Sequence, residues 1–113
     1  MAEFDLSQHE GKELELFRNY GNPYETISIR VQIDDGCMYL GDEEFEHGPD
    51  GGHSMRLYTF DAENTRKVFQ YLSQDDRDPI EMLKGFVNDN VRTHAFTALC
   101  DKLGIAYVEH FYL

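Results

Sequence analysis

Alternating polarity predicts a β-hairpin in the first half of the chain. Within residues 24–33, polar side chains alternate with β-branched apolar ones, a pattern typical of a half-buried strand. The sequence Asp34-Asp35-Gly36 follows directly and predicts a tight turn, which makes residues 37–45 the return strand. The apolar face of the first strand would consist of Ile27, Ile29, Val31 and Ile33.

Two further strands flank this hairpin in the sequence. Residues 12–20 alternate leucine with glutamate and predict a strand, although a short helix is an alternative there. Residues 46–53 are rich in Gly, Pro and Asp and predict a loop, and residues 54–60 alternate again. The first half of the chain is therefore expected to contribute four strands.

After residue 60 the apolar residues no longer recur at every second position but at the three- and four-residue spacing of a helix. Asp61 and the pair Asp78-Pro79 are typical helix starts, and Gly104 is a typical helix end. We expect three helices, the third beginning near residues 88–90. Their apolar stripes would be Thr65, Val68, Phe69 and Leu72, then Ile80, Leu83 and Val87, then Val91, Ala95, Ala98, Leu99 and Leu103.

These elements predict an α+β fold in one domain, residues 1–113. The expected architecture is an antiparallel sheet of about four or five strands with two to three helices packed on one face, in the order β-β-β-β-α-α-α-β. Its parts are an acidic hairpin and loop at 27–53, a helical segment at 61–103 and a C-terminal strand at 105–112. Apolar residues occur on both faces of that last strand, which favours an inner position in the sheet.

Composition adds a strong negative charge to this picture. The 113 residues include 22 acidic and 10 basic ones, giving a formal net charge of −12. The chain also holds 7 Tyr and 8 Phe, enough aromatic surface for a packed core rather than a disordered acidic tail. Such a charge repels nucleic acid and anionic membranes and speeds encounters with basic proteins.

The same features predict a cytoplasmic protein. No signal peptide or membrane-spanning stretch is recognisable in the sequence. The two cysteines, Cys37 and Cys100, lie far apart and form no CxxC motif, so two reduced thiols are expected.

The acidic residues are concentrated in two clusters. Residues 31–55 contain seven carboxylates and no Lys or Arg, and a shorter run follows at residues 75–78. Tyr39 and Phe45 lie among the first group, and aromatic anchors beside charged groups are typical of protein interfaces. The alternative is a solvated edge whose aromatics belong to the core. The predicted partner-binding residues are Asp34, Asp35, Tyr39, Asp42, Glu43, Glu44, Phe45, Glu46, Asp50, Asp75, Asp76 and Asp78.

No residue pattern predicts catalysis, a metal site or a cofactor. His47 and His53 flank a loop that contains Asp50, but their spacing matches no zinc motif. Phosphate-binding glycine motifs and catalytic triads are not recognisable in the sequence. We therefore expect no catalytic residue, no metal and no cofactor.

The resulting functional hypothesis is a non-catalytic acidic inhibitor. In kind, the chain resembles the immunity proteins of bacterial contact-dependent or interbacterial competition systems, which are small and acidic, although no motif identifies a particular family. The expected partner is a basic toxin domain, in particular a nuclease, with no direct binding of nucleic acid or membrane. Two alternatives remain open: a nucleic-acid mimic that blocks a DNA-binding effector, and a small ligand- or metal-binding enzyme that uses loop 46–54.

Overall fold

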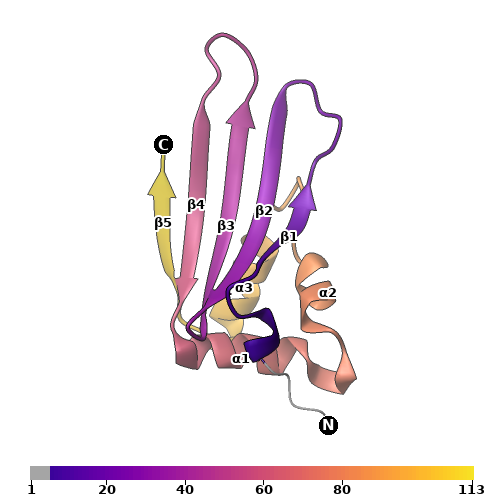
Figure 1. Ribbon diagram of the computed structural model, residues 1–113, viewed down its shortest axis with the longest axis vertical. Helices are drawn as coiled ribbons and strands as arrows, with labels where there is room; N and C mark the ends of the chain where they lie inside the picture. The colour runs from indigo at the N-terminus through magenta and orange to yellow at the C-terminus, as the bar shows by residue number, and fades with distance from the viewer. Residues whose placement is uncertain (1–5) are drawn as a thin grey trace.

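A computed structural model describes residues 6–113 and confirms the α+β fold (Figure 1). Five strands form one antiparallel sheet in which each strand lies beside the next along the chain, β1-β2-β3-β4-β5. Three α-helices come between the fourth and fifth strands. The strands are β1 (Glu13–Arg18), β2 (Glu25–Asp34), β3 (Cys37–Glu46), β4 (His53–Phe60) and β5 (Val108–Tyr112).

Two helix starts and one helix end lie where the sequence predicts them, whereas the second helix ends at Lys84, before the predicted stripe residue Val87. Helix α1 (Ala62–Leu72) begins at Asp61, whose side chain accepts a hydrogen bond from the Asn64 amide, and α2 (Pro79–Lys84) begins at Asp78 in the same way. Helix α3 (His94–Leu103) ends at Gly104, which has a φ of 71°. Short 3₁₀ turns lie at Leu6–His9 and Gln74–Asp76.

The β2–β3 hairpin has the predicted two-residue turn. Asp34 pairs with Cys37, and the two residues between them, Asp35 and Gly36, have φ angles of 52° and 76°. Positive φ at both central positions is the conformation that matches the right-handed twist of paired strands. The turn therefore sets the register of two ten-residue strands.

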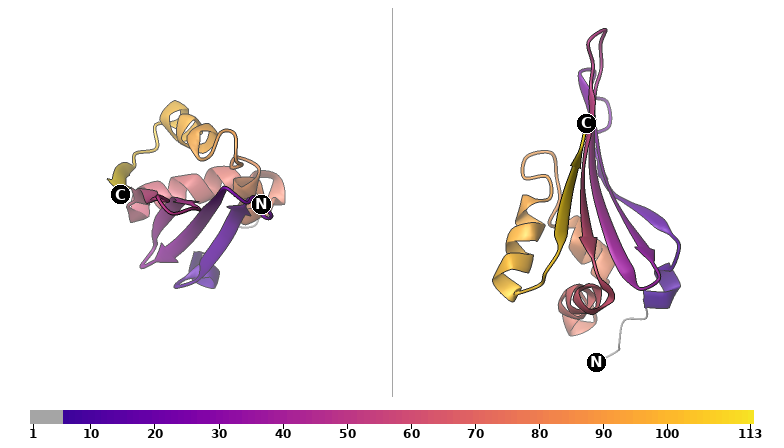
Figure 2. Two further views of the ribbon diagram at one scale, coloured as in Figure 1. Left: turned by 90° about the horizontal axis from the view of Figure 1, so that it is seen from above. Right: turned by 90° about the vertical axis from the view of Figure 1, so that its left-hand side faces the viewer.

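The helices cover one face of the sheet and leave the other face open (Figure 2). The core lies between these layers, and the alternation of β2 supplies much of it: Ile29 is fully buried and its three predicted companions are nearly so. The buried apolar set from the rest of the chain is Leu16, Met38, Leu40, Tyr58, Phe60, Val68, Phe69, Leu72, Ile80, Leu83, Val87, Phe96, Cys100 and Ile105.

The last strand differs from the prediction in two respects, its position in the sheet and its first residue. It lies at the edge of the sheet, paired only with β4, and all five of its residues are exposed. Apolar side chains on both faces suggested an inner strand, but the first four strands form an uninterrupted meander that leaves only an edge for β5. The strand also begins at Val108, three residues later than expected.

The buried stripe of the third helix was also predicted wrongly. Phe96, Thr97 and Cys100 face the core, whereas Val91 and Leu103 are exposed. The helix begins at His94 rather than near residue 89, and its position is set by the burial of the large Phe96 ring against Phe60 and Phe86.

Candidate partner-binding surface

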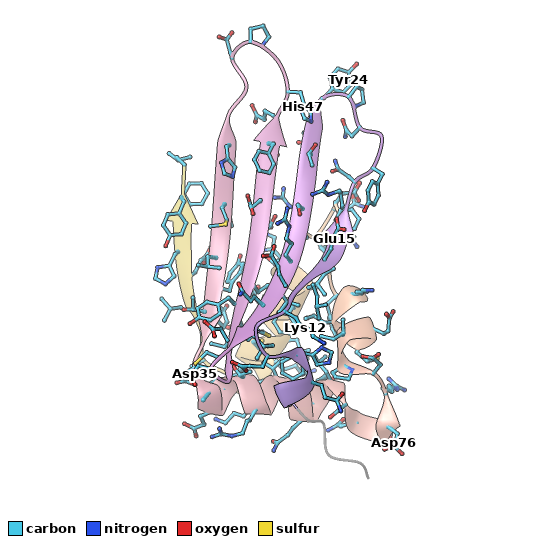
Figure 3. All side chains as sticks on the ribbon, in the orientation of Figure 1. Lys12, Glu15, Tyr24, Asp35, His47 and Asp76 are labelled. Atoms are coloured by element: carbon cyan, nitrogen blue, oxygen red, sulfur yellow. The ribbon has the colours of Figure 1, made fainter. Side chains whose placement is uncertain are left out.

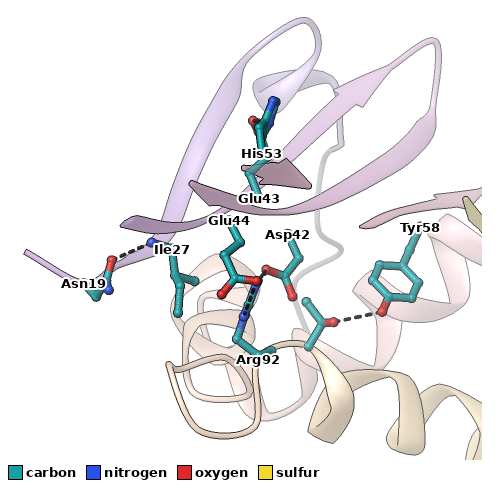
Figure 4. A network of polar contacts seen from close by, with 9 residues as sticks. Asn19, Ile27, Asp42, Glu43, Glu44, His53, Tyr58 and Arg92 are labelled. Carbon is teal, nitrogen blue, oxygen red and sulfur yellow. Dashed lines mark hydrogen bonds and ion pairs between the residues drawn. The ribbon is translucent and has the colours of Figure 1, made fainter. Parts of the chain in front are cut away.

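Strand β3 sends its acidic and aromatic residues to two opposite faces of the sheet. Successive side chains in a strand point to opposite sides. Asp42 and Glu44 share the helix-covered face with the buried Met38 and Leu40, whereas Glu43 lies on the open face (Figure 4). The acidic run of the sequence is therefore not a single surface.

On the helix-covered face, Asp42 is held by an arginine of the chain itself. Its carboxylate is 4% exposed and accepts two hydrogen bonds from Arg92, one of them from Nε at 3.0 Å (Figure 4). The third nitrogen of the guanidinium, Nη1, lies 3.9 Å from Glu44. Arg92 therefore neutralises part of the acidic cluster that the sequence assigns to a partner.

The loop at residues 85–93 is shaped to present this arginine. The Asn88 side chain accepts hydrogen bonds from the amides of Asn90 and Val91, each at 2.8 Å, and the Arg92 amide donates to the Asn88 carbonyl at 2.9 Å. Arg92 itself has a left-handed φ of 56°. The next residue, Thr93, is buried and donates to the Tyr58 hydroxyl, which fixes the loop against the sheet.

Near the same end of the sheet, two carboxylates approach each other. Glu44 beside Glu25 raises the pKa of Glu25, chiefly through a hydrogen bond between the two side chains that requires one of them to be protonated. Arg92 opposes this effect by favouring the charged form. The group formed by Glu25, Glu44, Asp42 and Arg92 is thus an internal charge network.

The open face holds the other half of the predicted set. Tyr39, Glu43 and Phe45 follow one another along the exposed side of β3. The Phe45 ring stacks on His53 of β4 with centroids 4.3 Å apart, and His53 Nε2 lies 3.1 Å from the Glu43 carboxylate. These three predicted residues and His53 form one continuous strip.

A shallow hollow of about 140 Å³ lies beside this strip, between the central strands. Its lining includes Tyr39, Glu43, Met55 and Leu57, and its floor is Gly41, where a Cβ atom would lie 3.9 Å from the Met55 sulfur. The absence of a side chain at residue 41 creates the hollow. Met55 and Leu57 are not among the predicted partner-binding residues, although the alternation of residues 54–60 is the signal that assigns them to the open face.

Two ion pairs lie on the first two strands, and one of them, Arg30 with Glu13, lines the hollow. Arg30 donates to Glu13 at 2.7 Å, and Arg18 lies 3.0 Å from Glu15. These pairs lie across or within strands on the open face, so they lower the local charge that a partner would meet. The net charge of the whole chain is unchanged by them and acts at longer range.

The remaining predicted residues lie at the two ends of the molecule (Figure 3). Asp34 and Asp35 form the β2–β3 turn beside α1, where the amides of Asp35 and Gly36 donate to Glu10. Glu46 and Asp50 belong to the opposite tip, near Tyr24 and His47. Beyond α1 lie Asp75 and Asp76 together with Asp78, whose carboxylate caps α2.

The loop at residues 46–54 does not bring its histidines together. His47 contacts the Thr26 hydroxyl at 2.8 Å, whereas His53 contacts Glu43. Among residues 6–113, no group of three metal-ligating side chains is close enough to hold an ion. Over the same range, no helix has the length and apolar character needed to cross a membrane.

The cysteines are two free thiols in different environments. Cys37 is half-buried at the start of β3, and Cys100 is buried in α3, where burial raises its pKa to about 12. Cys100 belongs to the buried core. A thiol with so high a pKa is unreactive at neutral pH.

Comparison of the chain with protein-family models, curated proteins and solved structures gave no significant match. The class of the protein is therefore defined by its fold alone: an α+β domain with a five-stranded antiparallel meander, helices on one face and the other face open.

Proposed function

We propose that this protein is a non-catalytic inhibitor that binds a basic protein partner through the open face of its sheet. The observation that carries the proposal is the strip formed by Tyr39, Glu43 and Phe45 beside the hollow over Gly41, whose lining combines Met55 and Leu57 with charged side chains. A sheet face with aromatic anchors and a hollow lined by both apolar and charged groups has the composition of a protein interface.

In this proposal the direct contacts and the net charge have different roles. The open-face carboxylates are paired within the chain, so the aromatic and apolar groups would supply most of the binding free energy. The net charge of −12 would steer a basic partner toward the protein and raise the association rate. Asp42 and Glu44 would support the fold rather than contact the partner.

The type of partner follows from the sign of the charge. Nucleic-acid enzymes carry basic surfaces that bind phosphate, and an acidic protein that covers such a surface blocks the substrate. The proposed activity is therefore that of an immunity protein against a toxin nuclease. In this proposal the protein acts in the cytoplasm, where its two thiols stay reduced.

The test begins with purification of the tagged chain from its native source and identification of the partner by mass spectrometry. The affinity of the identified partner is then measured for the parent and for the double variant Tyr39→Ser with Glu43→Gln. Glutamine keeps a group that can hydrogen-bond to His53, and both sites are on the sheet surface, so the fold should survive. We expect at least a tenfold loss of affinity, about 1.4 kcal/mol.

A matched control removes charge far from the open face. Asp75→Asn with Asp76→Asn lowers the negative charge while asparagine tolerates the left-handed backbone found at both residues. If the partner binds only the open face, this control should have nearly the parental affinity. Equal losses in both variants would favour the nucleic-acid mimic, and parental affinity in the open-face variant would refute the proposal.

A further inference from the structure

Strand β5 is an edge without the usual protection. Natural edge strands avoid pairing with other chains by carrying lysine, proline or a β-bulge. The opposite edge, β1, has a bulge between Glu15 and Phe17 and bears charged side chains. Strand β5 has no lysine, arginine, proline or bulge, and its Val108, Phe111 and Tyr112 side chains are 56%, 55% and 49% exposed.

The position of β5 leaves its outer edge accessible. In Figure 1 and in the left view of Figure 2, it is the outermost strand, and no other element of residues 6–113 lies beyond it. Its backbone is paired with β4 from Met55 to Thr59 on the inner side only. Backbone amides and carbonyls on the outer side can therefore accept another strand.

We propose that β5 pairs in antiparallel fashion with β5 of a second copy of this chain, giving a twofold dimer with a continuous ten-stranded sheet. This inference rests on the edge itself and is independent of the proposed inhibitor function. A twofold axis between identical antiparallel strands passes beside one residue and brings each side chain opposite one that lies on the same face.

An axis at His110 pairs the most residues of β5 and avoids contact between like charges. Val108 then lies opposite Tyr112 of the second copy on the open face, and Glu109 lies opposite Phe111 of the second copy on the other. All five strand residues are paired, and the two Glu109 carboxylates are kept apart. An axis at Glu109 would place these like charges directly opposite each other, which destabilises a sheet.

The charge of β5 favours a second copy over a basic partner. Its one carboxylate, Glu109, is bound by Arg56 at 2.9 Å, and the same guanidinium lies over the Phe111 ring at 5.2 Å from the centroid. The edge is thus close to neutral in a chain of net charge −12. A basic protein would find no free carboxylate on β5, whereas an identical neutral apolar edge is complementary to it.

The small size of the contact predicts a reversible dimer. Two five-residue strands bury less surface than the roughly 1,200–2,000 Å² typical of stable complexes. The net charges of the two copies also repel each other, and salt screens that repulsion. The dimer population should therefore rise with protein concentration and with ionic strength.

The first experiment is sedimentation equilibrium of the full chain over a range of concentrations. We expect a monomer–dimer equilibrium whose dissociation constant rises at least tenfold in the double variant Val108→Lys with Tyr112→Lys. The control, Tyr20→Lys with Tyr24→Lys, makes the same charge change at two exposed aromatics of the β1–β2 loop and should dimerise like the parent. A monomer at every concentration, open-ended polymers, or equal weakening in the control would overturn the proposal.

A second experiment tests the register with a single substitution on the proposed axis. Antiparallel partners on a twofold axis have Cα atoms about 4.5–5.5 Å apart, within the range that a disulfide spans. His110→Cys in a Cys37→Ser background should form a covalent dimer on mild oxidation, in which two thiols lose two electrons and two protons to the oxidant. Tyr24→Cys in the same background should stay monomeric, and failure of the His110 variant to cross-link would refute the register.

Discussion

Arg92 and Asp42 form an ion pair between two parts of the chain that are fifty residues apart. The arginine belongs to the loop at residues 85–93, and the carboxylate lies near the middle of β3 on the helix-covered face. Asp42 is almost fully buried, so its charge needs a nearby cation, and the Arg92 guanidinium supplies one. The pair therefore joins the connection between α2 and α3 to the centre of the sheet.

Removing the arginine should destabilise the fold strongly. Arg92→Met leaves a buried carboxylate without its partner, and such changes cost about 3–5 kcal/mol. Urea denaturation followed by circular dichroism measures the free energy of unfolding. Arg66→Met, at an exposed position of α1, is the matched control and should change stability by less than about 0.5 kcal/mol.

A double substitution distinguishes the contribution of the ion pair from that of the loop backbone. When both charges are replaced, as in Asp42→Leu with Arg92→Met, no buried charge remains and much of the lost stability should return. A double variant as unstable as Arg92→Met would show that the arginine acts through the loop backbone rather than through Asp42.

The pattern of β3 already contained the information that divides its acidic residues between two faces. Residues 37–45 were predicted to be a strand, and in a strand Asp42 and Glu44 must share the side of Met38 and Leu40. Counted along the sequence, the acids form one cluster, whereas the strand period divides them between the two faces of the sheet. Applying the alternation to this strand would have placed only Glu43 beside Tyr39 and Phe45.

Other features were beyond the reach of sequence patterns. The β2–β3 hairpin was predicted because alternation and turn chemistry are local. The partner of Asp42 was not, since Arg92 becomes its neighbour only when the helices fold back onto the sheet. The edge position of β5 likewise depends on how the first four strands are ordered, and no local signal in residues 105–112 records that order.

Stability should depend on pH through Glu25. Its pKa in the folded state is raised above the ordinary value of 4.5, chiefly by the hydrogen bond with Glu44. The folded state therefore binds this proton more tightly than the unfolded state, so the stabilising contribution is present below pH 4.5 and is lost as the pH rises through the folded pKa. Above that range the charged Glu25 is repelled by Glu44.

The variant Glu25→Gln should remove this dependence. It should unfold at a higher temperature than the parent at pH 7 and at nearly the same temperature at pH 4, as measured by thermal denaturation. Glu63→Gln is the control, because it removes an exposed pair with Lys67 and should not stabilise the protein at either pH. A Glu25 variant less stable than the parent at pH 7 would contradict the assigned cause.

The two thiols should differ in their reaction with iodoacetamide. Thiolate is the reactive form, and the pKa of about 12 leaves buried Cys100 almost entirely protonated at pH 7.5. Cys37 is half-buried and should be alkylated first, giving a single addition by intact mass spectrometry. Cys37→Ser should leave the folded protein unmodified, and urea should restore labelling of Cys100. Rapid labelling of Cys100 in the folded protein would show that α3 opens readily.

A side chain added in the hollow on the open face should raise the stability of the fold and weaken the binding of the proposed partner. Gly41 lies within β3 without a positive φ, and a Cβ atom there would make an ordinary contact with the Met55 sulfur. Gly41→Ala should therefore stabilise the fold by about 0.4–1 kcal/mol, because glycine loses more conformational freedom on folding. The same methyl group would make the hollow shallower where the proposed partner is in contact. We expect a higher urea midpoint together with weaker partner binding, a combination that a purely structural role for this face would not produce.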